Sequence, residues 1–177
     1  MLNYPKVIER TRLIPQSKAD IDRVRGLPTI QSAADNKIME NTDISNLPAF
    51  GTYAAAFEES LLDDDWTRLE QYFSPGATYP PGDGTKASGR DAVIETLKDS
   101  VNTLERKCDS RDALGDPEIS ESEDTITLKF TINYSSKGLP GLILRGHETA
   151  QFSNGLILRM GDVIDDPSAT SDWMEKL

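Results

Sequence analysis

The sequence is poor in the residues from which many metal and redox sites are built. Its 177 residues include one cysteine, Cys108, and one histidine, His147. An intrachain disulfide therefore cannot form, and zinc sites made of several cysteine or histidine ligands are excluded. We expect neither a metal nor a cofactor.

Positive charge is also scarce. Lysine and arginine total 19 against 30 aspartates and glutamates, which gives a net charge of −11. Because binding to nucleic acid or to an anionic membrane surface needs clustered cations, we expect neither partner. No apolar run approaches the length of a membrane span, and the first residues hold no apolar core of signal-peptide length. These features favour a cytoplasmic protein.

The sequence does contain a run of helical patterns followed by strand patterns. Residues 1–46 lack a wide apolar face and are expected to form a partly ordered N-terminal extension, so the domain would span 47–177. Helices followed by antiparallel strands predict an α+β domain, with a curved antiparallel sheet wrapped on three helices. The helices are expected at about 46–61, 64–73 and 90–104, and the clearest strand, with an apolar residue at every second position, at 125–134.

Three stretches carry a resemblance to a known superfamily. They read AAAFEESLLDDDWTRLEQYFSPGATY, GRDAVIETLKDSV and GHETAQFSNGLILRM, and a closing aspartate follows them. Over residues 48–166 the order and spacing of these landmarks resemble the nuclear transport factor 2-like (SnoaL-like) superfamily. The resemblance implies a cone with an apolar pocket at its wide end, a small apolar organic molecule as ligand and a homodimer. Members include isomerases, dehydratases, cyclases, epoxide hydrolases and scaffolds without chemistry, so the fold does not give the function.

The active site of ketosteroid isomerase-like members is only partly matched. The position of their first-helix tyrosine corresponds to Phe57, which cannot donate a hydrogen bond. Their general base corresponds to the stretch that begins at Tyr79, where the next carboxylate is Asp83. Their strand carboxylic acid corresponds to Glu148. One of three functional positions keeps a usable group, so a steroid isomerase of that type is not expected.

Other active sites of the superfamily are also matched in part. Scytalone dehydratase-like members use more than one histidine, and only His147 is present. The Asp-Arg-Asp set of limonene epoxide hydrolase-like members has candidates in Asp109, Arg111, Asp162 and Glu148. SnoaL-like cyclases use a strand carboxylate near a histidine, for which Glu148 and His147 are the nearest match. Neighbouring residues of a strand point to opposite faces, so these two cannot share a pocket unless a bulge intervenes.

The register of the hairpin around Asn154-Gly155 decides which side chains share a face. A two-residue type I′ turn, which Asn-Gly favours, places His147 opposite Asp162. A three-residue loop with a glycine bulge shifts the count by one. It would place Glu148 opposite Met160 and on the face of Asp162. We favour the first register and leave the second open.

Glu148 is the leading candidate for a catalytic residue, with Asp162 and Tyr79 assisting. In apolar surroundings the pKa of a carboxyl group rises, which suits proton transfer at neutral pH. The alternative is a structural carboxylate paired with Arg145 or Arg159. Candidate ligand-binding residues, which could equally be core, are Phe57, Trp66, Phe130, Tyr134 and Met160.

Two further features have simpler interpretations. The acidic run 63–65 precedes a predicted helix and is expected to stabilise its N-terminus rather than bind metal. Cys108 has basic neighbours but no base nearby, so an unreactive thiol is expected. The leading hypothesis is a small-molecule-binding protein, with cofactor-free isomerase, dehydratase or cyclase activity through carboxylates. The alternative is a non-catalytic ligand-binding or dimeric interaction protein.

Overall fold

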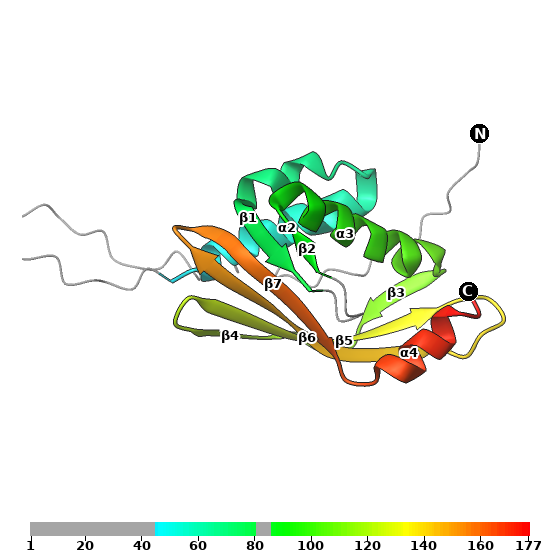
Figure 1. Ribbon diagram of the computed structural model, residues 1–177. Coiled ribbons are helices and arrows are strands. Elements are labelled where there is room, and N and C mark those ends of the chain that lie inside the picture. Colours follow the sequence, from blue (N-terminus) through cyan, green and yellow to red (C-terminus); the bar gives the residue numbers. More distant parts are fainter. Residues whose placement is uncertain (1–44, 81–85) are drawn as a thin grey trace, which may run out of the picture.

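The computed structural model describes residues 45–80 and 86–177. Two long helices, α2 and α3, cover one face of a bent sheet, and a short helix, α4, packs at the far end of that sheet (Figure 1). The elements are, in chain order, α2 (Leu47–Asp63), the 3-10 helix η1 (Thr67–Tyr72), β1 (Phe73–Tyr79), β2 (Ala87–Ser88), α3 (Arg90–Thr103), the 3-10 helix η2 (Glu105–Lys107), β3 (Ser110–Ala113), β4 (Glu118–Ser122), β5 (Thr125–Ser135), β6 (Leu142–Ser153), β7 (Leu156–Ile164) and α4 (Pro167–Met174).

The sheet has seven strands, and the predicted α+β architecture is confirmed. The strand order is β2-β1-β7-β6-β5-β3. Strand β4 also pairs with β5, at residues 125–129, whereas β3 pairs with residues 132–135 of the same strand. One detail of the prediction is wrong: the sheet is mixed rather than antiparallel, because β1 runs parallel to β7. The chain reaches β1 directly from the helical layer and enters the sheet beside its last strand. We call the face covered by α2 and α3 the inner face.

Helix α2 covers part of the inner face of the sheet (Figure 1). It starts after Asn46, and Pro48 sits in its first turn, where a missing amide hydrogen costs nothing. Apolar residues at three- and four-residue spacing then face the sheet, and Phe50 and Tyr53 are buried. The helix ends where Asp64 adopts a left-handed conformation, with φ of 63°.

In the described ranges, no helix has both the length and the apolar character needed to span a bilayer.

Several predicted elements differ in detail from those observed. The helix expected over 64–73 is a short 3-10 helix, η1, and the strand after it already begins at Phe73. Strand β4 and helix α4 were not predicted. The expected N-terminal extension lies outside the described residues, apart from Ser45 and Asn46. Those two bind the carboxylate of Glu121 on β4, with donor–acceptor distances of 2.6 Å each.

The interior contains two clusters of buried residues. The first lies between the helices and strands β1, β6 and β7, and includes Tyr53, Phe73 and Ile157. The second lies between α4 and the far ends of β5 and β6, and Trp173 of α4 closes it. The Trp173 Nε1 donates a hydrogen bond to the Pro140 carbonyl over 2.7 Å, which ties the C-terminal helix to the sheet.

The β6–β7 hairpin follows neither predicted register throughout. Its turn is the two-residue turn favoured from the sequence, because Asn154 and Gly155 both have positive φ and Phe152 pairs with Ile157. A β-bulge then adds Leu158 to β7, so that Gln151 pairs with Arg159. The result is that Ile157 and Met160 both face inward, although two exposed residues separate them.

Beyond the bulge every pair is shifted by one residue from the favoured register. His147 lies opposite Val163, and Glu148 lies opposite Asp162. The prediction that His147 faces Asp162 is therefore wrong. A regular ladder would have paired Glu148 with Gly161 and turned Asp162 to the outer face. The bulge instead brings the two carboxyl groups together on the inner face.

Candidate functional site

Four polar side chains from four elements gather at the inner face beneath α2. Glu148 on β6 and Asp162 on β7 are a cross-strand pair. Tyr79, the last residue of β1, donates a hydrogen bond from its hydroxyl to Asp162 Oδ2. Tyr53 extends down from α2, close enough for the charges of both carboxyl groups to act on its hydroxyl. We call these four residues the carboxyl–tyrosine cluster.

The cluster leaves several hydrogen-bonding groups unused. Asp162 Oδ1 is buried and has no hydrogen-bond partner among the described residues. Neither the Glu148 carboxyl nor the Tyr53 hydroxyl forms a hydrogen bond with another described residue. The Tyr53 side chain is only 2% exposed. Buried polar atoms normally have a partner, so the unpartnered Asp162 Oδ1, beside a carboxyl group and a phenol that make no hydrogen bond to a described residue, indicates a place where something else binds.

Burial raises the pKa of both carboxyl groups, and the charge of one acts on the other. Burial, followed by the charge of Asp162, raises the pKa of Glu148 to about 8. Burial also raises the pKa of Asp162, but the hydrogen bond from Tyr79 and the charge of His147 act in the opposite direction. The ionised form of Asp162 thus has a donor, whereas that of Glu148 has none. Within the pair, a shared proton is therefore favoured on Glu148 rather than on Asp162.

The Tyr53 phenol is a weaker acid than an ordinary tyrosine. Burial, with the nearby charges of Glu148, Asp162 and Tyr79, raises the pKa of its phenol well above the usual value. Its hydroxyl therefore stays protonated and can donate a hydrogen bond to an acceptor such as a carbonyl oxygen. Together the cluster offers one carboxylate as base, one carboxylic acid and two phenols.

The structure places the predicted site residues in two groups. Glu148, Asp162 and Tyr79, the three predicted catalytic residues, lie together. The predicted ligand-binding residues are dispersed. Phe57 is partly buried against the first core cluster, and Trp66 and Met160 are buried within it, whereas Phe130 and Tyr134 belong to the second cluster.

Tyr53 was missed as a polar residue of the site. The sequence assigned the first-helix tyrosine position to Phe57, one helical turn further along α2, and did not single out Tyr53 as a site residue. Tyr53 is indeed buried, with aromatic neighbours including Phe73 at a ring-centroid distance of 5.5 Å. Its i, i+4 spacing to Phe57 was the available signal, because both residues occupy the same face of the helix.

His147 lies on the outer face of the sheet, behind the cluster. It lines an outer-face hollow of about 360 Å³ together with Lys129 and Arg145. A second hollow, of about 160 Å³, lies beside α4. Neither is lined by any member of the carboxyl–tyrosine cluster. Glu148 makes no ion pair with a described residue, so the structural pairing with Arg145 or Arg159 considered above is not formed.

Arg111 belongs to a separate polar cluster. Its guanidinium lies 3.4 Å from Glu58 Oε1 and 3.3 Å from Glu105 Oε2, and the Tyr134 hydroxyl donates to Glu105 over 3.1 Å. Arg111 pairs with Tyr134, six residues along β5 from Leu128, which faces Glu148. At about 3.3 Å per residue, the position of Arg111 is roughly 20 Å along the sheet from that of Glu148. Arg111 therefore does not join the two carboxyl groups of the candidate site.

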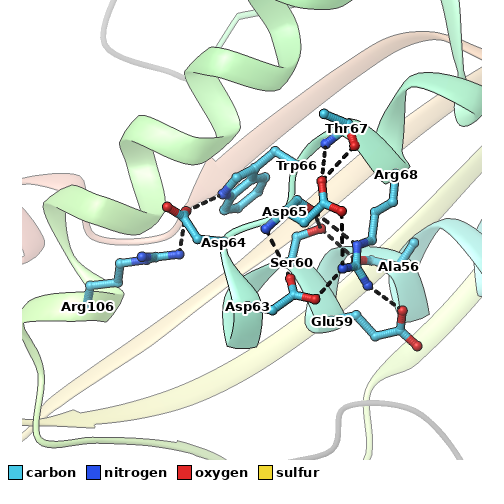
Figure 2. A network of polar contacts seen from close by, with 10 residues as sticks. All are labelled: Ala56, Glu59, Ser60, Asp63, Asp64, Asp65, Trp66, Thr67, Arg68 and Arg106. Carbon is cyan, nitrogen blue, oxygen red and sulfur yellow. Dashed lines mark hydrogen bonds and ion pairs between the residues drawn. The ribbon is translucent and has the colours of Figure 1, made fainter.

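The three aspartates 63–65 form hydrogen bonds and ion pairs with residues around the turn between α2 and η1 (Figure 2). Asp64 accepts hydrogen bonds from the Trp66 indole and from Arg106, at 2.7 and 2.8 Å. Asp65 accepts from the amide and the hydroxyl of Thr67, at 3.1 and 2.6 Å, at the start of η1. Asp63 pairs with Arg68. Among the described residues, no group of three acidic, histidine or cysteine side chains is arranged to hold a metal ion.

Cys108 lies apart from the carboxyl–tyrosine cluster. Burial, followed by the charges of Glu105 and Asp109, raises the pKa of its thiol. The sulfur donates weakly to the Leu104 carbonyl over 3.3 Å. A thiol with a raised pKa is a poor nucleophile at neutral pH.

Comparison with known proteins establishes the fold. No family model and no curated protein matches the sequence. Solved structures do match, among them TerC co-crystallised with polyporic acid, with 19% identity and a TM-score of 0.53 over 73% of this chain and 98% of that one.

Two further structures show the same likeness. An NTF2-like protein of unknown function from Burkholderia pseudomallei is 18% identical, with a TM-score of 0.55 over 74% of this chain and 98% of the other. A putative SnoaL-like polyketide cyclase from Jannaschia sp. is 11% identical, with a TM-score of 0.56 over 78% of this chain and 98% of the other. Such identities show a shared fold rather than a shared activity. The chain therefore has the fold of the nuclear transport factor 2-like (SnoaL-like) superfamily, as its sequence landmarks indicated.

Proposed function

We propose that the protein binds a small, largely apolar organic molecule at the carboxyl–tyrosine cluster and moves a proton on it without a cofactor. The observation that supports this most is a set of polar groups without a hydrogen bond to any other described residue: the Asp162 Oδ1 atom, the Glu148 carboxyl and the Tyr53 hydroxyl. Neighbouring structures of this fold are described as polyketide cyclases or contain a small organic molecule, which favours the same reading.

Each group has a role in this proposal. Asp162, ionised and held by Tyr79, accepts a proton from a carbon next to a carbonyl group. Tyr53 and the protonated Glu148 donate hydrogen bonds to the carbonyl oxygen, where negative charge develops. Glu148 then supplies its proton to the product, and the proton that Asp162 took passes to Glu148, which restores the starting state of both groups. An isomerisation, dehydration or cyclisation can follow from such an enolate, and such acid–base groups typically contribute about 10²–10⁴-fold in rate.

The test is proton exchange on simple substrates. Incubation in D₂O with a panel of uncharged ketones, followed by NMR, measures deuterium entry at the carbon next to the carbonyl. We expect exchange by the wild type and a loss of at least about 100-fold in Asp162→Asn and Glu148→Gln. Glu118→Gln is the matched control, since Glu118 is an exposed carboxylate paired with Lys129 on the outer edge. Equal exchange by the wild type and the two cluster variants would contradict the proposal.

The alternative, a binding or interaction protein, is favoured by a different observation. Ile143 and Val163 on the outer face of β6 and β7 are about half exposed, and Val163 lies opposite His147, four residues along β6 from Ile143. A homodimer that joins two outer faces would bury them. Light scattering tests this directly: Val163→Asp should convert a dimeric wild type into a monomer, and a monomeric wild type would refute it.

A further inference from the structure

A single row of side chains crosses the inner face of the sheet at the candidate site. Asp162 lies opposite Glu148, Glu148 opposite Leu128 on β5, and Leu128 opposite Ile119 on β4. Residues directly opposite each other in antiparallel ladders point to the same face. The row thus begins with two carboxyl groups and ends with two apolar side chains at the edge strand.

The apolar end of this row is open. Leu128 is only partly buried, and Ile119 is 48% exposed. The neighbouring row is closed by comparison, because Ile126 is fully buried and Glu121 at its end holds Ser45 and the amide of Asn46 at the start of α2. Among residues 45–80 and 86–177, the inner face is therefore covered along one row and left open along the next, at the row that leads to the carboxyl groups.

The dimensions of the row limit what can lie on it. Adjacent strands are about 4.8 Å apart, so Ile119 on β4 lies roughly 10 Å across the sheet from Glu148 on β6. No lysine or arginine belongs to the row, and the whole chain carries a net charge of −11. An anionic head group would meet two carboxyl groups without a compensating cation, so such a ligand is disfavoured.

We propose that the ligand is an elongated, uncharged molecule whose polar head reaches Glu148 and Asp162 and whose apolar body lies along Leu128 and Ile119. This inference rests on the proposed function, because it takes the carboxyl–tyrosine cluster as the polar end of the site. Leu128 and Ile119 then determine specificity: they select for the length and the apolar character of the ligand body, and they take no part in proton transfer.

Binding of a neutral fluorescent probe tests the proposal without a known substrate. N-phenyl-1-naphthylamine would be bound to the wild type and displaced by a series of 1-alkanols of increasing length. We expect affinity to rise by up to about fourfold for each added methylene until the chain reaches the edge strand, and then to level off. A series that shows no dependence on length would overturn the inference.

A pair of variants locates the site. Ile119→Asp should weaken binding of the longer alkanols by about tenfold and leave the shortest ones unchanged, since only the longer chains reach β4. Leu114→Asp is the control: Leu114 is 46% exposed and lies near the same sheet edge, but it lines the hollow on the outer face. Equal effects of the two variants, or none from Ile119→Asp, would refute the role of Leu128 and Ile119.

Two comparisons complete the test. Alkyl carboxylates of equal length should bind at least tenfold more weakly than the alkanols, and equal binding would overturn the requirement for an uncharged ligand. The deuterium-exchange assay is read separately from probe binding. Exchange that depends on Glu148, together with alkanol binding that is insensitive to Ile119→Asp, would refute this inference and leave the proposed chemistry standing.

Discussion

Replacing Glu148 by glutamine removes a carboxyl group that the folded protein prefers to keep protonated. In the folded protein the Glu148 pKa is raised to about 8 from a reference value of 4.5, by burial and then by the charge of Asp162. A raised pKa means that the native state binds this proton more tightly than the unfolded state does. The stabilisation is therefore fully present below about pH 4.5 and is lost as the pH rises through about 8.

The size of the effect follows from the same shift. Each pH unit is worth about 1.4 kcal/mol per proton, so the wild type should lose up to about 5 kcal/mol of unfolding free energy across this window through Glu148 alone. Glu148 is partly solvent-accessible, which reduces the expected loss to about 3 kcal/mol. The glutamine variant has no such proton to lose. Its stability relative to the wild type should therefore rise by about 3 kcal/mol between pH 5 and pH 9.

Urea unfolding followed by the fluorescence of Trp66 and Trp173, both buried, measures this difference at each pH. The comparison between the two proteins cancels the titrations that they share. Glu118→Gln provides the control for a general effect of removing a carboxylate, since Glu118 is exposed at the outer edge of β4. A stability difference between Glu148→Gln and wild type that stays constant from pH 5 to pH 9 would refute the assignment of Glu148 as a buried, protonated acid.

Three further predictions concern the surroundings of the site. Tyr79→Phe removes the hydrogen bond that lowers the pKa of Asp162, so a ¹³C NMR titration of the carboxyl groups should show that pKa rising further; an unchanged or lower value would contradict the contact. Arg111→Met leaves Glu58 and Glu105 without their cation and should cost about 2–4 kcal/mol in urea unfolding, with partial recovery in Arg111→Lys; a neutral change in the first variant would show that the ion pairs do not matter. Gly146→Ala places a methyl group 2.3 Å from the Val163 carbonyl oxygen and should destabilise by about 3 kcal/mol, whereas Gly161→Ala, whose nearest neighbour is at 3.5 Å, should cost less than about 1 kcal/mol; equal losses would contradict the close approach of β6 and β7.

The periodic parts of the fold were predictable from the sequence because periodicity reports burial. The stripe of α2, the third helix and the alternation of β5 are all observed, and the helix expected at about 90–104 spans Arg90–Thr103. Elements with weak periodicity were not found. Strand β4 is almost entirely exposed, so its sequence shows no alternation, and α4 buries only Trp173. The parallel pairing of β1 with β7 is a long-range contact for which the local sequence gives no signal.

The candidate site shows the same division. Side-chain chemistry together with the family resemblance singled out Glu148. Because successive side chains of a strand point to opposite faces, the sequence also placed His147 on the face opposite to Glu148, as observed. The partners of Glu148 depended on the hairpin register, which local turn chemistry settles only near the turn. Tyr53 was hidden for another reason: a buried aromatic residue on a helix stripe is usually core, and only its polar neighbours in space distinguish it.

The bulge at Leu158 accounts for the form of the site. The Asn-Gly turn requires Phe152 to pair with Ile157, whereas the alternation of Leu156, Leu158 and Met160 would place those three residues on one face. Both demands cannot be met by a regular ladder. The extra residue in β7 resolves the conflict by exposing Leu158 and burying both Ile157 and Met160. It also changes the facing of every later residue, so that Asp162 lies beside Glu148. The apposition of the two carboxyl groups, and with it the part of the rise in the Glu148 pKa that comes from the charge of Asp162, thus follows from a local packing conflict a few residues away in the same hairpin.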